Sequence, residues 1–470
     1  MLTLADILEA LTDRRPEGAG TVITDSVIDS RHVIPGSLFV AIPGERVDGH
    51  DFVSDAFQNG ASVAMIQKDQ LANFRTLDIR KSAFISAGDL STPICLRVEN
   101  TVLALQQVAR FWRRKLNLRV IGITGSVGKS TTKELVAEIL SVRYRTIKNL
   151  GNLNNEIGLP LTLLRIGNGY ERVVLEMGFY VPGEIELLCE ISLPHIGVIT
   201  NIGMVHAERA GSMEAIARGK AELIQSLPPE GTAILNFDDP FVRKMKENSR
   251  AQVLFYGLSS EADLWADQIE SLGLDGIRFQ LHYEKETLHI HAPLIGRHSV
   301  HTVIRSIAVG LVDGLTWQEI IQGIKQGHTQ FRLAAVRSRN GSLILDDTYN
   351  ASPESMLAAL NLLDELEGRK IAVLGDMLEL GPYEDQGHEL VGVRAAQVSR
   401  LLLTFGPRGH LIAKAAAKAG MQGSQIMEYE EPEPLIRWLQ DNLTQTDTVL
   451  IKGSHGLQMD RITAALEIES

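Results

Sequence analysis

The sequence is poor in cysteine and has no excess of positive charge. Its 470 residues include two cysteines, Cys95 and Cys189, which are too few and too far apart for a disulfide framework or a zinc ribbon. We expect both to be small buried side chains. Lys and Arg number 46 against 58 Asp and Glu, which gives a net charge of −12. Because non-specific nucleic-acid binding depends on an excess of Lys and Arg, we expect no nucleic-acid partner.

Long apolar runs and low-complexity segments are also missing. The longest stretch without Asp, Glu, Lys or Arg, residues 191–207, is interrupted by Pro194, His195 and Asn201, so we expect no membrane insertion. The N-terminal sequence MLTLADILEALTDRRPEG carries acidic residues early and predicts an amphipathic helix, not a signal peptide. These features favour a cytoplasmic location.

The composition is that of an ordinary globular protein, with 44% apolar and 22% charged residues. At roughly 150 residues per domain, the length predicts about three domains. The pattern of strands and helices changes near residues 115 and 330. We therefore predict domains over residues 1–115, 116–330 and 331–470.

Strand and helix patterns alternate through most of the chain, which predicts an α/β fold with parallel sheets. In the first domain, strand patterns occur in SLFVAI and ASVAMI. The central domain begins with RVIGIT, a glycine-rich turn and the helix pattern TTKELVAEILSV, and continues with RVVLEM and HIGVITNI. Residues 250–292 differ, because alternating pieces such as IRFQLHY and TLHIHA predict antiparallel strands. In the third domain, SLILDD, KIAVLGD, RLLLTF and TVLIKG read as strands, each followed by a helix pattern.

The strongest local motif is GITGSVGKSTT, residues 122–132. A glycine-rich turn that leads into a helix presents backbone N–H groups to phosphate oxygens. The match to the usual phosphate-binding loop is imperfect, since Ile123 occupies the first glycine position. The alternative is a plain strand–turn–helix with a solvated lysine, but the flanking strand and helix favour phosphate binding. The expected nucleotide-binding residues are Gly125, Ser126, Gly128, Lys129, Ser130 and Thr131.

Possible metal ligands follow the next strands. Glu176 ends one strand and His206 follows another, and a parallel sheet gathers such groups at one edge. Lys220 lies on the apolar face of the helix pattern SMEAIARGKAELIQSL, where burial favours its neutral form. A neutral amine can take up CO₂ and form a carbamate, which binds metals. The alternative is a lysine that extends from the edge of the apolar stripe to solvent, and spacing alone favours this alternative.

Several of these segments together resemble the Mur ligases, the ATP-dependent amide-forming enzymes of peptidoglycan precursor synthesis. The resemblance rests on GITGSVGKSTT, GNLNNEIGLPLTLL, LEMG, TNIGMVHAE and ARGKAEL. Four further stretches are similar to the branch of this family that adds D-alanyl-D-alanine to UDP-N-acetylmuramoyl-tripeptide. They are DSRHVIPGSLFVAIPGERVDGHDF, DDTYNASPESMLAAL, AVLGDMLELG and LIKGSHGLQMD. The resemblance covers essentially the whole chain.

The resemblance implies a UDP-sugar-binding domain, a central ATPase domain with a phosphate loop, and a C-terminal Rossmann-like domain for the incoming amino component. It implies ATP and Mg²⁺ as cofactors. We expect a monomer, although the sequence itself does not determine the oligomeric state. It also favours the carbamate at Lys220. The implied metal ligands are Ser130, Glu176, His206 and Lys220, and the implied ATP contacts outside the loop are Arg332, Asp347 and Asn350. The implied substrate-binding residues are Ser30, Arg31, Asn152, Asn154, Asn155, Asp376, Glu379 and Lys452.

The chain departs from the family pattern at four positions. Ser299 and Thr302 stand where the adenine-side motif usually carries asparagines, Ser352 stands where asparagine is common, and His455 replaces a frequent arginine. Asp376 and Glu379 are candidates for the base that deprotonates the amine, and capping of a helix N-terminus explains them equally well.

Two other functions stay open from the sequence. A sibling ligase, such as a folylpolyglutamate synthetase or the enzyme that adds the third peptide residue, would share the phosphate loop but not DDTYNASP and LGDMLELG. A regulatory ATPase without ligase chemistry would need neither a sugar-nucleotide domain nor a separate C-terminal domain. The third residue of the tripeptide, lysine or diaminopimelate, is left undetermined.

Overall fold

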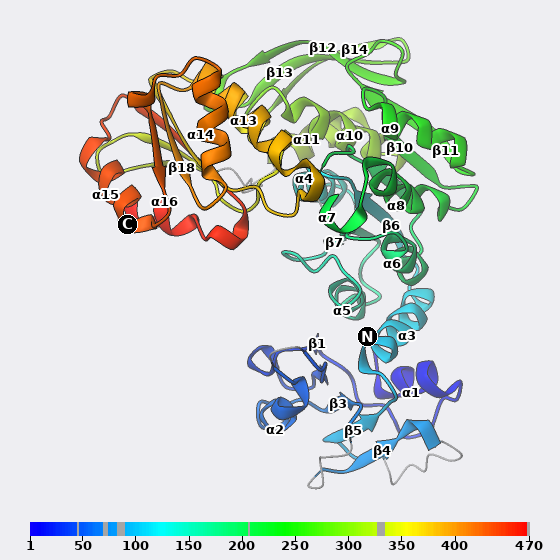
Figure 1. Cartoon of the computed structure of the whole chain (residues 1–470). Coiled ribbons are helices and arrows are strands. Elements are labelled where there is room, and N and C mark those ends of the chain that lie inside the picture. The colour runs from blue at the N-terminus through cyan, green and yellow to red at the C-terminus, as the bar shows by residue number, and fades with distance from the viewer. Residues whose placement is uncertain (45–46, 69–73, 82–89, 205–206, 327–333, 468–470) are drawn as a thin grey trace.

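A computed structural model describes residues 1–44, 47–68, 74–81, 90–204, 207–326 and 334–467 (Figure 1). Within these ranges the strands form three sheets of five, nine and six strands, in chain order. The five-stranded sheet lies at one end of the molecule, the nine-stranded sheet in the middle and the six-stranded sheet beside it. In the described part of the chain, no helix is long and apolar enough to cross a membrane.

The first sheet is parallel throughout and has the order β1-β2-β3-β5-β4. The predicted strands SLFVAI and ASVAMI are β2 and β3, and the predicted N-terminal helix is α1 (Leu4–Thr12). Thr3 caps this helix, since its side chain accepts the N–H of Asp6 while the Asp6 carboxylate accepts the N–H of Thr3. The strands are β1 (Ser26–Val27), β2 (Leu38–Val40), β3 (Val63–Ile66), β4 (Thr76–Asp78) and β5 (Ile94–Arg97), with α2 (Val53–Gln58) beside them.

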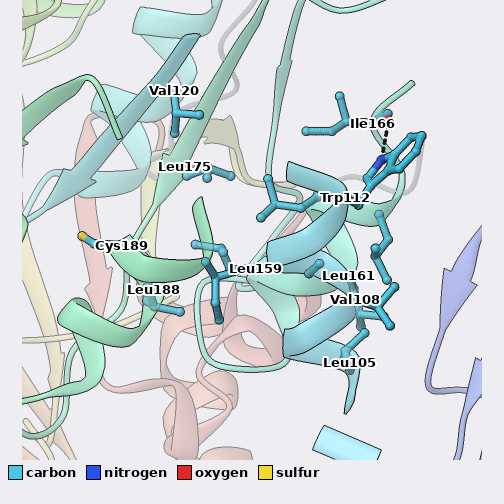
Figure 2. Close-up of a cluster of buried hydrophobic side chains, with 14 of the residues drawn as sticks. Leu105, Val108, Trp112, Val120, Leu159, Leu161, Ile166, Leu175, Leu188 and Cys189 are labelled. Carbon is cyan, nitrogen blue, oxygen red and sulfur yellow. Dashed lines mark hydrogen bonds between the residues drawn. The ribbon is translucent and has the colours of Figure 1, made fainter. Parts of the chain in front are cut away.

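Helix α3 (Thr101–Lys115) joins the first sheet to the middle one. Its buried face, with Leu105, Val108 and Trp112, packs against α5 (Gly158–Leu164) and lies close to α6 (Glu184–Ser192) (Figure 2). The indole N–H of Trp112 donates to the carbonyl oxygen of Ile166 at 2.9 Å, so its one polar group is satisfied inside the core. The same helix also contacts α1, and the apolar core therefore runs without a break from the first sheet into the middle one.

The middle sheet has the order β14-β13-β12-β11-β10-β9-β6-β8-β7. All neighbouring strands from β7 through β8, β6, β9, β10 and β11 to β12 pair in parallel. Strand β13 pairs antiparallel with both β12 and β14, so the antiparallel pairing predicted within 250–292 is confirmed. The strands are β6 (Arg119–Thr124), β7 (Thr146–Lys148), β8 (Arg172–Glu176), β9 (Ile196–Ile199), β10 (Thr232–Asn236), β11 (Gln252–Gly257), β12 (Leu264–Ser271), β13 (Ile277–Tyr283) and β14 (Glu286–Ala292).

Helices cover both faces of the middle sheet, and two separate apolar clusters result. One face carries α4 (Lys129–Ser141), α10 (Ser299–Val312) and α11 (Trp317–Gln326). The other carries α3, α5, α6 and α8 (Met213–Gln225). When helices cover both faces of a parallel sheet, the carboxyl ends of its strands stay accessible, and ligands bind there in such folds.

The third sheet has the order β15-β16-β20-β17-β18-β19, and all its pairs are parallel except β15–β16. Helices on both faces make it Rossmann-like, as the family resemblance implies. The strands are β15 (Ala334–Arg337), β16 (Leu343–Asp347), β17 (Arg369–Gly375), β18 (Leu401–Phe405), β19 (Ile426–Tyr429) and β20 (Asp447–Lys452). The helices are α12 (Pro353–Glu365), α13 (Glu384–Val398), α14 (Gly409–Lys418), α15 (Pro432–Asn442) and α16 (Asp460–Leu466).

The predicted α/β class is thus confirmed. The domain limits stay a prediction. Helix α3 ends at the proposed limit near 115 and packs on both sides of it, while the limit near 330 lies outside the described residues.

Helix α3 offers a matched pair of leucines that tests the shared core. Leu105 is fully buried, whereas Leu103 on the same helix is 63% exposed. We expect Leu105→Ala to lower the free energy of unfolding by about 2–5 kcal/mol, because a buried cavity is left. Leu103→Ala should change it by about 0.5 kcal/mol or less. Urea unfolding of the two variants measures the difference, and equal losses would contradict the packing in Figure 2.

Candidate active site

A cavity of about 540 Å³ lies between the carboxyl edges of the middle and third sheets. It brings together most of the residues proposed from the sequence, although they come from segments more than 300 positions apart. The predicted residues that line it are Ser126, Gly128, Lys129, Ser130, Thr131, Asn152, Asn154, Asn155, Glu176, Asp347, Asn350, Glu379 and Lys452. The four positions that depart from the family pattern, Ser299, Thr302, Ser352 and His455, line it as well.

The loop between β6 and α4 has the backbone shape of a phosphate cradle. Gly125 and Gly128 have φ values of 145° and 82°, a region that side chains with a Cβ rarely adopt. A Cβ at Gly125 would lie 1.8 Å from the Thr200 hydroxyl oxygen. Asn201 fixes the loop, because its Oδ1 accepts the N–H groups of Ser126 and Val127 at 3.2 and 2.9 Å. Helix α4 then begins at Lys129 and directs its positive end toward the cavity.

Two lysines donate to one carbonyl oxygen of this loop. The Nζ of Lys129 lies 2.8 Å from the Gly125 oxygen, and the Nζ of Lys220 lies 3.2 Å from the same atom. Lys220 is fully buried, and its Nζ lies 4.6 Å from the centroid of the Phe179 ring. Burial, and then the charge of Lys129, lower the pKa of Lys220 well below its ordinary value. Lys220 is therefore not a solvated lysine at the edge of the apolar stripe.

The acidic side of the site centres on Glu176. This carboxylate is 2% exposed at the end of β8, and its Oε2 lies 2.5 Å from the Ser130 hydroxyl oxygen. Its Oε1 accepts from the Asn154 amide at 3.0 Å. Asn149 holds the backbone on both sides, donating to the Glu176 carbonyl oxygen and accepting its N–H. The Nζ of Lys133, a residue that is 2% exposed, lies 3.9 Å from Oε2 of Glu176.

This donor set fits Mg²⁺, which prefers hard oxygen ligands and retains water and substrate phosphate in its shell. A hydroxyl and a carboxylate oxygen meet at the phosphate loop. Among the described residues no three His, Cys, Asp or Glu side chains gather as a metal cluster. A metal here would therefore complete its shell with ligand and water oxygens.

The third sheet contributes an ion pair at the opposite wall. Lys452, 1% exposed at the end of β20, donates to the Asp347 carboxylate and to the Asn350 carbonyl oxygen, both at 2.7 Å. Asp347 ends the neighbouring strand β16. The pair joins two strand ends and fixes the loop that follows β16 at the cavity wall.

Five predicted residues lie elsewhere or outside the described part of the chain. Ser30 and Arg31 lie in the first sheet's domain, where Arg31 is 84% exposed and pairs with Asp29. Asp376 does not line the cavity. Its Oδ1 accepts the N–H of Arg408 at 2.9 Å, and burial raises its pKa. Of the two candidate bases, Glu379 lines the cavity and Asp376 does not. His206 and Arg332 lie outside the described residues.

Three residues that the sequence analysis did not single out hold the site in place. Asn149 and Asn201 position Glu176 and the loop, as described above. Glu354, in the first turn of α12, accepts the N–H of Met204 at 3.0 Å and so joins the third sheet's domain to the segment after β9. Gly203, which directly precedes Met204, exchanges two hydrogen bonds with the Ser126 hydroxyl. Asn149 and Asn201 each stand at or just beyond a strand end, and this position is the one signal that could have drawn attention to them.

Family comparisons agree with this arrangement. Three models match the chain: the catalytic domain of the Mur ligase family over residues 23–113, the Mur ligase middle domain over 123–310, and the glutamate ligase domain of Mur ligases over 331–455. A UDP-N-acetylmuramoyl-tripeptide–D-alanyl-D-alanine ligase of Bacillus subtilis is 34% identical, with 100% of this chain and 98% of that protein covered.

Solved structures give the same result. MurF from Acinetobacter baumannii is 30% identical with a TM-score of 0.84, covering 99% of this chain and 98% of that one. MurF ligase from Thermotoga maritima in complex with ADP is 28% identical with a TM-score of 0.79, covering 97% of each chain. On the strength of these matches along nearly its whole length, the chain belongs to the Mur ligase family.

Proposed function

We propose that this protein is an ATP-dependent ligase that joins D-alanyl-D-alanine to UDP-N-acetylmuramoyl-tripeptide in peptidoglycan precursor synthesis. The observation that carries the proposal is a single cavity that joins the phosphate loop of the middle sheet to Asp347, Asn350 and Lys452 of the third sheet. An enzyme that couples nucleotide cleavage to the reaction of a second substrate must bring both ligands together, and this cavity has one wall from each of the two sheets. The relatives with end-to-end similarity act on D-alanyl-D-alanine according to their names.

The chemistry begins with a carboxylate, which is a poor acyl donor. One oxygen of the tripeptide's terminal carboxylate attacks the γ-phosphorus of ATP, the bond to the β-phosphate oxygen breaks, and ADP leaves. The acyl phosphate then has a good leaving group. Lys129 and the N-terminus of α4 stabilise the negative charge on the phosphoryl oxygens, and Arg332 is proposed to assist from its position in the sequence.

Amide formation follows at the same carbon. The free amine of D-alanyl-D-alanine attacks the acyl carbon, the C–N bond forms, and phosphate leaves from a tetrahedral intermediate. The amine must lose a proton, and Glu379 is the better placed of the two candidate bases because it lines the cavity. Asp347, Asn350 and Lys452 are proposed to position nucleotide and acceptor on their side of the cavity.

Ser130 and Glu176 are the proposed ligands of Mg²⁺, and a carbamylated Lys220 with His206 is proposed for a second ion. When bound, Mg²⁺ neutralises phosphate charge. For the carbamate, the neutral amine of Lys220 adds to CO₂ and releases one proton, which leaves an N-carboxylate. Full burial and the lowered pKa of Lys220 support this step, because the neutral amine is the reactive form.

The remaining assignments follow from this function. Ser30 and Arg31 are proposed to bind the UDP group in the domain of residues 1–115. Asn152, Asn154 and Asn155 are proposed to face the tripeptide. We propose a cytoplasmic monomer that acts on small molecules and binds no nucleic acid.

The direct test is mass spectrometry of the product. We expect ATP, D-alanyl-D-alanine and one of the two UDP-tripeptides, ending in lysine or in diaminopimelate, to give a conjugate. Its mass should be the sum of the masses of UDP-N-acetylmuramoyl-tripeptide and D-alanyl-D-alanine less one water. ADP and phosphate should form in equal amounts. ATP turnover without an acceptor would support a regulatory ATPase instead, and extension of a different acceptor would support a sibling ligase.

Lys129→Ala tests the phosphate loop. We expect ADP release that depends on D-alanyl-D-alanine to fall by about 10²–10³-fold or more, because a positive charge at the phosphoryl group is lost. Lys148→Ala is the matched control, since Lys148 pairs with Glu134 and does not line the cavity. Near-normal turnover of the Lys129→Ala enzyme would contradict the assignment of this loop to phosphate binding.

Lys220→Ala tests the carbamate. We expect loss of activity and partial recovery on addition of short carboxylates such as acetate or propionate, because these replace the missing carboxylate. Lys129→Ala serves as the control, since a carboxylate cannot replace its positive charge. Absence of rescue, together with full wild-type activity in CO₂-free buffer, would contradict the carbamate.

A further inference from the structure

A buried arginine lies directly behind the phosphate loop and has no carboxylate partner in the described part of the chain. Arg305, in the middle of α10, is 4% exposed. Its Nε donates to the Thr132 hydroxyl at 2.6 Å, and its Nη2 donates to the Thr302 hydroxyl at 2.7 Å and to the Gly128 carbonyl oxygen at 3.5 Å. All of these acceptors are uncharged. The guanidinium is therefore hydrogen-bonded but its charge is not neutralised by a neighbouring acid.

An isolated buried charge is unfavourable unless an opposite charge compensates it. Buried Asp313 is compensated in this way, since Arg119 and Arg172 both pair with it at 2.9 and 2.6 Å. Arg305 also lies beside the N-terminus of α4, whose helix dipole repels a cation. Two positive features thus meet behind one loop, and an anion bound in front of that loop would compensate both.

The contacts of Arg305 reach the cavity through two residues. Gly128 and Thr302 both line it, whereas Arg305 does not. A Cβ at Gly128 would lie 2.6 Å from Nη2 of Arg305, so the guanidinium packs directly against the turn. The Thr132 hydroxyl accepts from Arg305 and donates to the Gly128 carbonyl oxygen at 2.6 Å. This chain of bonds fixes the orientation of the Gly128 peptide at the start of α4.

We propose that Arg305 is a positioning residue for the nucleotide phosphates: it fixes the Gly128 turn and supplies, from behind the loop, a charge that only bound phosphate neutralises. The proposal rests on the proposed nucleotide site. It makes affinity depend on the number of phosphate charges and not on the base. A purely structural arginine would affect folding without this dependence.

The test compares ADP with adenosine, each binding to the full-length chain in isothermal titration calorimetry. We expect Arg305→Met to raise the Kd for ADP by about tenfold or more while the Kd for adenosine changes by about twofold or less. In steady-state assays KM for ATP should rise by a similar factor, with a smaller change in kcat. Arg305→Lys, which keeps the charge but not the planar fork, should recover most of the ADP affinity.

Arg113→Met is the matched control. Arg113 is also 4% exposed, but its guanidinium donates to the carbonyl oxygens of Leu116 and Leu118, just beyond α3, and of Ser192 at the end of α6. It does not line the cavity. We expect it to lower Tm without changing the Kd for ADP. If Arg305→Met does not fold, Arg305→Gln carries the same comparison, since glutamine is neutral and still donates to a hydroxyl.

Three outcomes separate this proposal from the function on which it rests. Selective loss of ADP affinity in the neutral variants supports the proposal whether or not D-alanyl-D-alanine is the acceptor. A folded neutral variant with an unchanged Kd for ADP, or with equal losses for ADP and adenosine, overturns it and leaves the ligase assignment intact. A wild-type chain that does not bind ADP overturns both.

Discussion

The site depends on one backbone turn, residues 125–128, keeping a single shape. Gly125 has no room for a side chain beside Thr200, and its carbonyl oxygen accepts from two lysines at once. Asn201 accepts the N–H groups of Ser126 and Val127. Because those groups are engaged below the loop, the N–H groups at the start of α4 are the ones directed toward the cavity. Catalytic and binding groups elsewhere are placed relative to this turn.

The turn is also connected to the third sheet. Glu354 of α12 accepts the N–H of Met204, and adjacent Gly203 bonds to the Ser126 hydroxyl. A second contact joins the N–H of Glu208 to the carbonyl oxygen of Glu379. The third sheet therefore contacts the phosphate loop through one intermediate segment. Since a displacement of about 1 Å can cost 10²-fold in rate, such contacts matter for bringing an acceptor to an acyl phosphate.

Local pattern was sufficient to predict much of this architecture. The glycine-rich turn before α4, the strand ending at Glu176 and the alternating third-domain elements are adjacent in sequence, so propensity and periodicity reveal them. Asn201 and Glu354 could not be found this way, because their partners lie 74 and 150 positions distant. Asp376 had the right position after a strand, but its side chain turns to cap the Arg408 peptide. The direction in which a loop side chain points is set by tertiary packing, which local sequence patterns do not reveal.

Net charge says little about such a site, because the relevant charges are arranged by contact. The chain carries −12 overall, whereas residues 119–148 hold six basic and two acidic side chains. Lys133 and Lys148 both pair with Glu134, and Arg119 and Arg143 pair with Asp313 and Glu319 outside this segment, so contacts compensate much of its charge. The positive potential at the loop then comes from Lys129, the α4 dipole and Arg305. Arg305 donates to Thr302, one of the positions that depart from the family pattern, so this departure and the buried charge form one unit.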